Sequence, residues 1–174
     1  PGAGVAKVTD DYRSFLGLAS HEYFHAWNVK RIKPAAFVPY DLARERYTRQ
    51  LWAFEGITSY YDDLALLRSG VIDAESYLEL LGRTASAVLR TPGRRVQSVA
   101  DASFDAWIKY YRPDENTPNA GVSYYAKGAL VALALDLELR RDGSSLDALM
   151  RELWRRHGET GVGVPEDGIA PLAS

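Results

Sequence analysis

Apolar residues recur at intervals of three and four along most of this 174-residue chain, and alternation of apolar and polar residues is hard to find. A period of three to four residues is that of one face of an α-helix, whereas a half-buried strand alternates at every second residue. With 47% hydrophobic residues, the chain has enough apolar material for one domain with a substantial core. We therefore expect an all-α domain.

Helix-starting and helix-stopping residues divide the chain into about six predicted helices. Pro34 must end the first helix, because proline supplies no backbone donor. Gly70 is a suitable C-terminal cap for the second helix, and Asp73 is a suitable N-cap for the third. The predicted helices span residues 12–30, 42–68, 74–90, 98–110, 122–141 and 144–157. Residues 161–174 are rich in Gly and Pro, and we expect them to form a flexible tail.

Composition bears on partners and compartment. Lys and Arg number 21 against 23 Asp and Glu, so the net charge of -2 gives no reason to expect nucleic acid or an anionic membrane as a partner. No apolar run approaches the roughly 20 residues that span a bilayer, and the start of the chain does not resemble a signal peptide. The chain contains no Cys, which leaves His and carboxylates as metal ligands. These features favour a cytoplasmic location, and the Gly-rich start without Met suggests that residues 1–174 are one domain of a longer protein.

One short segment of the first predicted helix, His21-Glu22-Tyr23-Phe24-His25, contains two histidines and a glutamate, side chains that can bind a metal ion or transfer a proton. Residues four apart lie on the same face of a helix, so His21 and His25 can both direct a ring nitrogen at one metal ion. Glu22 then lies beside that ion, as in the H-E-x-x-H zinc peptidases, where the Glu polarises a zinc-bound water. The alternative is that the two histidines lie four residues apart on a helix by chance and bind no metal. A chance H-E-x-x-H match occurs in about one in a few hundred chains of this size.

The residues around this segment are mostly apolar. They are Phe15, Leu16, Leu18, Ala19, Phe24 and Trp27. Unpaired polar side chains are costly in apolar surroundings. The pattern therefore predicts a buried helix whose polar groups are compensated by a bound metal ion.

A third metal ligand is expected downstream, because a catalytic zinc usually takes three protein ligands and one water. Asn28 and Arg31 stand where metzincins have Gly and a third His, which excludes that class. Glu55 is the best candidate, since a bare carboxylate would be costly in its apolar segment, and a structural carboxylate is the alternative. The adjacent Gly56 costs about 1 kcal/mol of helix stability, which indicates a close approach of two helices. Asp62 returns to the same helix face and can accept a proton from the far nitrogen of a ligand His.

Three blocks of sequence resemble the glycyl aminopeptidase family of gluzincin zinc peptidases, which are relatives of thermolysin and aminopeptidase N. The blocks run from His21 to Pro34, from Glu55 to Tyr61 and from Ser123 to Gly128. They occur in the right order, so the match is far more specific than a five-residue motif. The resemblance implies the helical catalytic lobe of a thermolysin-like fold.

The resemblance also assigns roles to individual residues. It implies that Zn²⁺ is bound by His21, His25 and Glu55, with Glu22 as general base. Tyr125 falls on the Tyr-x-Lys-Gly pattern of aminopeptidase N-like enzymes, in which the Tyr donates a hydrogen bond to the tetrahedral oxyanion. A Tyr hydroxyl directed at a developing oxyanion is a sensible stabiliser. The alternative for Tyr125 is an aromatic core residue near a helix start.

The activity that the resemblance implies is zinc-dependent hydrolysis of a peptide substrate, by an aminopeptidase that releases small N-terminal residues such as Gly. A thermolysin-like endopeptidase and a non-catalytic scaffold of the same fold that binds other proteins are the alternatives. The β-rich N-terminal lobe of gluzincins and the PDZ module of family relatives are not visible in the sequence. We therefore expect the isolated chain to be weakly active or inactive.

Overall fold

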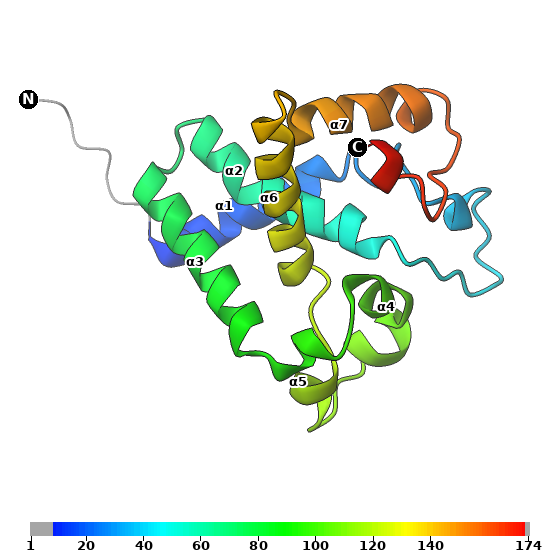
Figure 1. Cartoon of the computed structure of the whole chain (residues 1–174), viewed down its shortest axis with the longest axis horizontal. Coiled ribbons are helices and arrows are strands. Elements are labelled where there is room, and N and C mark those ends of the chain that lie inside the picture. The colour runs from blue at the N-terminus through cyan, green and yellow to red at the C-terminus, as the bar shows by residue number, and fades with distance from the viewer. Residues whose placement is uncertain (1–8, 173–174) are drawn as a thin grey trace, which may run out of the picture.

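A computed structural model describes residues 9–172 as a set of packed helices (Figure 1). The α-helices are α1 (Asp10–Phe24), α2 (Ile57–Arg68), α3 (Ala74–Arg90), α4 (Val99–Phe104), α5 (Thr117–Ala120), α6 (Ala126–Arg141) and α7 (Leu146–Leu153). Short 3-10 turns span Ala35–Phe37, Pro92–Arg95 and Ala170–Leu172, and π-helical turns span Trp52–Gly56, Ala106–Tyr110 and Trp154–Gly158. The described residues form isolated β-bridges but no strand, so the predicted all-α fold is confirmed.

Helix α6 passes through the middle of the molecule (Figure 1). It packs against α2, α3, α7 and the π-helical turn Trp52–Gly56, and α1 packs along α2. The main core is built from apolar side chains of these elements. Its most deeply buried members, each at most 2% exposed, include Ala53, Phe54, Ile57, Ala132, Leu146 and Leu153. Between residues 9 and 172, no helix has the length and apolarity needed to cross a bilayer.

The second predicted helix begins later than expected. The sequence predicts helix from residue 42, but the chain becomes helical only near Leu51 and starts with a π-helical turn. Tertiary contacts explain the late start, because the residues just before Leu51 are hydrogen-bonded to the C-terminal segment. Thr48 donates a hydrogen bond to Glu166 Oε1 at 2.6 Å, and the Arg49 N–H donates to Glu166 Oε2 at 2.9 Å.

The segment that was predicted to be a flexible tail packs against the domain over residues 161–172. Val164 is 1% exposed, and its N–H donates to the Lys33 carbonyl at 2.7 Å. The Ala35 N–H donates in turn to the Val164 carbonyl at 2.8 Å, and Ile169 is also buried. Burial of two apolar side chains and these backbone bonds outweigh the tendency of Gly and Pro to leave a chain open. The last two residues of the predicted tail lie outside the described residues.

The predicted burial of the first helix is wrong. Helix α1 ends at Phe24 rather than near residue 30, and only Arg13 of its residues is buried. Phe15, Leu18 and Tyr23 are 61%, 60% and 69% exposed. Helix α1 contacts α2 along one side, while most of its apolar residues face solvent.

Two glycines meet where the π-helical turn Trp52–Gly56 crosses α6. A Cβ added to Gly56 would lie 2.5 Å from Gly128 Cα, and one added to Gly128 would lie 2.8 Å from the Trp52 carbonyl oxygen. Only residues without a side chain allow this contact. The close approach that Gly56 predicts therefore occurs, and its partner is α6.

We expect Gly128→Ala to lower the free energy of unfolding by about 1–3 kcal/mol, because an added methyl group overpacks a contact made of rigid backbone. Gly82→Ala is the matched control, since a Cβ at this position in α3 meets no atom within 4 Å. It should be neutral or stabilise the fold by up to about 1 kcal/mol. Urea unfolding curves compare the two variants. An undiminished stability of Gly128→Ala would contradict the close-packing account.

Candidate metal centre

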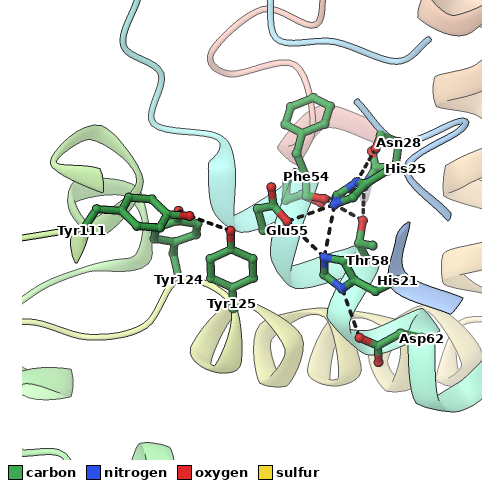
Figure 2. Close-up of polar contacts among 11 residues, drawn as sticks. His21, His25, Asn28, Phe54, Glu55, Thr58, Asp62, Tyr111, Tyr124 and Tyr125 are labelled. Carbon is green, nitrogen blue, oxygen red and sulfur yellow. Dashed lines mark hydrogen bonds and ion pairs between the residues drawn. The ribbon is translucent and has the colours of Figure 1, made fainter. Parts of the chain in front are cut away.

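Three donor atoms converge between the end of α1 and the π-helical turn that precedes α2 (Figure 2). Nε2 of His21 lies 3.1 Å from Nε2 of His25. Oε2 of Glu55 lies 3.3 Å from the first nitrogen and 3.1 Å from the second. The structure thus brings together the three side chains that the sequence predicts as metal ligands.

The outer ring nitrogens of both histidines are already engaged. His25 Nδ1 lies 2.8 Å from the Asn28 carbonyl, which can only accept, so this nitrogen carries a hydrogen. His21 Nδ1 lies 3.1 Å from Asp62 Oδ2, and the carboxylate favours a hydrogen on that nitrogen too. In the neutral rings, both Nε2 atoms then present lone pairs to each other and to the Glu55 carboxylate. A cation resolves such a convergence of acceptors.

The spacing of the donors fits a tetrahedral metal ion. Bonds of about 2.0–2.1 Å separate two tetrahedral ligand atoms by about 3.3–3.4 Å. The observed separations of the His21, His25 and Glu55 donors are 3.1 to 3.3 Å. Two imidazoles and one carboxylate form a donor set that suits Zn²⁺. A carboxylate behind a ligand His, as Asp62 stands behind His21, is a common support of such ions.

The pKa shifts of His21 and Glu55 show that the cluster favours a positive charge. Burial alone would lower the pKa of His21, but hydrogen bonds to Asp62 and Glu55 outweigh burial and raise this pKa to about 9. Burial would raise the pKa of Glu55, but hydrogen bonds with His21 and His25 lower it to about 2. A proton and a metal ion compete for the same lone pair here.

Asn28 is a buried support that the sequence did not reveal. Its side chain is 2% exposed, and its carbonyl orients His25. Its amide group donates to the carbonyls of Ala53 and Phe54 and to Thr58 Oγ1. One residue therefore holds His25 and also the segment that bears Glu55. In the sequence pattern Asn28 serves only to exclude another peptidase class, because the partners of its side-chain amide lie more than 20 residues away.

The donors line an open pocket of about 550 Å³. Its lining includes every residue predicted for the site: His21, Glu22, His25, Glu55, Asp62 and Tyr125. Glu22 is exposed, and its carboxylate has no hydrogen-bond partner in the described part of the chain.

Tyr125 lies just before α6 rather than inside a helix that begins at residue 122. Its ring centroid is 6.2 Å from that of His21, and its hydroxyl oxygen lies 2.9 Å from that of Tyr111. The neighbouring Tyr124 is 1% exposed and belongs to a second core cluster. The core position is thus taken by Tyr124, while Tyr125 faces the pocket. Burial raises the pKa of Tyr125, so its hydroxyl stays protonated and can donate.

An all-α domain with this pocket at the meeting of α1, α2 and α6 has the architecture of the helical lobe of a peptidase. The model of the M61 glycyl aminopeptidase family matches residues 14–131, and the chain belongs to this family. It is also similar to the crystal structure of an aminopeptidase N family protein from Idiomarina loihiensis, with 50% sequence identity and a TM-score of 0.91. That alignment covers 97% of this chain and 29% of the solved chain. No curated protein matches the sequence.

Proposed function

We propose that this chain forms the zinc-binding part of a metallopeptidase that removes small N-terminal residues, such as Gly, from peptide substrates. The observation that carries the proposal is the triangle of His21, His25 and Glu55 donors, whose edges of 3.1 to 3.3 Å fit one tetrahedral ion. Membership of the glycyl aminopeptidase family supports the substrate class.

In this proposal His21, His25 and Glu55 hold Zn²⁺, which when bound supplies a Lewis acid that polarises the scissile carbonyl and acidifies a water. Glu22 takes the proton of that water and passes it to the departing amine. Its position on the pocket and its lack of a hydrogen-bond partner among the described residues leave the carboxylate free for both transfers. No covalent intermediate with the protein is needed.

Tyr125 stabilises the negative charge that develops on the carbonyl oxygen. Its hydroxyl lies at the pocket that holds His21 and Glu55, and it is neutral at physiological pH. A neutral hydroxyl held in advance of the reaction is an effective donor to an oxyanion.

The exopeptidase and endopeptidase readings differ in what they require of the substrate. An aminopeptidase must recognise a free α-amino group, whereas an endopeptidase accepts a blocked one. Hydrolysis rates of matched peptides with a free and an acetylated N-terminal Gly separate the two. Rapid cleavage of the acetylated peptide would favour the thermolysin-like alternative.

Zinc titration of the metal-free protein should give one ion per chain, and His21→Ala should abolish binding. Asp62→Asn should weaken the affinity by about 10- to 100-fold, because His21 loses the carboxylate that fixes its ring. Asp63→Asn is the matched control, since no contact joins that side chain to His21 in the structure, and its affinity should stay close to that of the native chain. Zinc binding that survives His21→Ala would contradict the ligand set.

Glu22→Gln should keep zinc at full stoichiometry and lose nearly all hydrolysis, because an amide of the same shape cannot accept the proton of a water. The activity is measured on the full-length protein, and bound metal is measured on the same sample. If Glu22→Gln hydrolyses peptides at the native rate, the general base is another group.

Tyr125→Phe should lower kcat by about 10²- to 10³-fold while KM changes little, because the lost hydrogen bond is formed only to the developing oxyanion. The measurement is steady-state hydrolysis of a Gly-peptide by the full-length protein. A rise in KM at constant kcat would instead assign Tyr125 to substrate binding.

A further inference from the structure

The hydroxyls of Tyr111, Tyr124 and Tyr125 lie close together beside the pocket, and Figure 2 shows the contact between Tyr111 and Tyr125. The Tyr124 hydroxyl donates to the Tyr111 oxygen at 3.4 Å, and the Tyr111 and Tyr125 oxygens lie 2.9 Å apart. Tyr124 is buried, and Tyr125 lies at the pocket. Tyr111 therefore connects a core side chain to the group proposed to bind the oxyanion.

The order of the three residues favours one direction of donation. Tyr124 is 1% exposed, and a buried hydroxyl must use its hydrogen within the protein. The Tyr111 oxygen accepts this hydrogen, and a hydroxyl that accepts becomes a stronger donor. Of the two tyrosine oxygens within hydrogen-bond distance of the Tyr111 hydroxyl, the Tyr125 oxygen is the nearer, at 2.9 Å.

We infer that Tyr111 is a positioning residue: it donates its hydrogen to the Tyr125 oxygen and so leaves the Tyr125 hydrogen free to point into the pocket. This inference rests on the proposed role of Tyr125 as oxyanion donor. In the row Tyr124 to Tyr111 to Tyr125, each hydroxyl polarises the next, so the last one donates more strongly than an isolated phenol.

The fold holds the Tyr111 ring from a second element. Tyr111 directly follows the π-helical turn Ala106–Tyr110, and its N–H donates to the Ala106 carbonyl at 3.1 Å. Its ring stacks on Trp107 with centroids 5.3 Å apart and meets Tyr110 edge-on, also at 5.3 Å. These contacts fix the ring without using its hydroxyl. Phe at position 111 can therefore keep the packing and remove only the hydrogen bonds.

The test begins with Tyr111→Phe in the full-length protein. We expect kcat to fall by about 5- to 30-fold with KM nearly unchanged, as for loss of one hydrogen bond that acts in the transition state. Tyr110→Phe is the matched control, because its ring touches Tyr111, Tyr124 and Tyr125 while its hydroxyl pairs with Ser123 Oγ at 3.3 Å. Its kcat should stay within about 2-fold of the native value. An unchanged kcat for Tyr111→Phe would overturn the inference. A higher kcat would overturn it too, since it would mean that the Tyr111 oxygen accepts the Tyr125 hydrogen and so competes with the oxyanion for it.

A double-mutant cycle separates this inference from the proposed function. If Tyr111 acts through Tyr125, adding Tyr111→Phe to Tyr125→Phe causes no further loss, whereas multiplied losses show an independent role and overturn the inference. If Tyr125→Phe lowers kcat and Tyr111→Phe does not, the role of Tyr125 stands and that of Tyr111 is overturned. An unaffected Tyr125→Phe overturns both.

A second measurement does not depend on activity. In full-length protein labelled with ¹³Cζ-tyrosine, the Tyr125 resonance is identified by its absence from Tyr125→Phe. It should move in Tyr111→Phe, which loses the hydrogen bond but keeps the ring, and should stay in place in Tyr110→Phe. A Tyr125 resonance that does not move in Tyr111→Phe would contradict a hydrogen bond from Tyr111.

Discussion

The convergence of two imidazole nitrogens and one carboxylate oxygen on one point is the constraint around which this domain is organised. These atoms are held 3.1 to 3.3 Å apart, a spacing that requires a proton or another cation among them. The fold must therefore impose the geometry from outside. It does so with groups that contact the far sides of the two histidine rings, namely Asp62 behind His21 and the Asn28 carbonyl behind His25.

The turn after α1 has an unusual backbone conformation next to the site. Val29 has φ of 106°, a conformation that is strained for a β-branched residue, and its N–H donates to the Ile32 carbonyl at 2.8 Å. This turn brings Ile32 alongside Asn28, whose carbonyl lies against the His25 ring while its side chain is buried. The π-helical turn Trp52–Gly56 is the matching irregularity on the other side, and such turns are frequent at functional sites.

The sequence allowed prediction of those parts of the site that depend on local periodicity. The four-residue spacing of His21 and His25, and the return of Asp62 to the face of Glu55, follow from helix geometry and are found in the structure. Asn28 and Tyr111 could not be predicted, because their roles depend on contacts between distant segments.

Local patterns also misled wherever packing between elements decides the outcome. The apolar residues of α1 predicted burial, yet most of them are exposed. The Gly- and Pro-rich end predicted a flexible tail, yet Val164 is held between Lys33 and Ala35. Periodicity identifies which face of a helix is apolar, but it does not identify which neighbour covers that face.

The contact between Gly56 and Gly128 has a mechanical consequence for the site. Gly56 directly follows Glu55, and Gly128 lies three residues after Tyr125, so these two pocket side chains are anchored to the same point of backbone contact. With no side chain between them, the two segments pack backbone against backbone. The position of the Glu55 carboxylate relative to the Tyr125 phenol is thereby set by a single contact between rigid main-chain atoms.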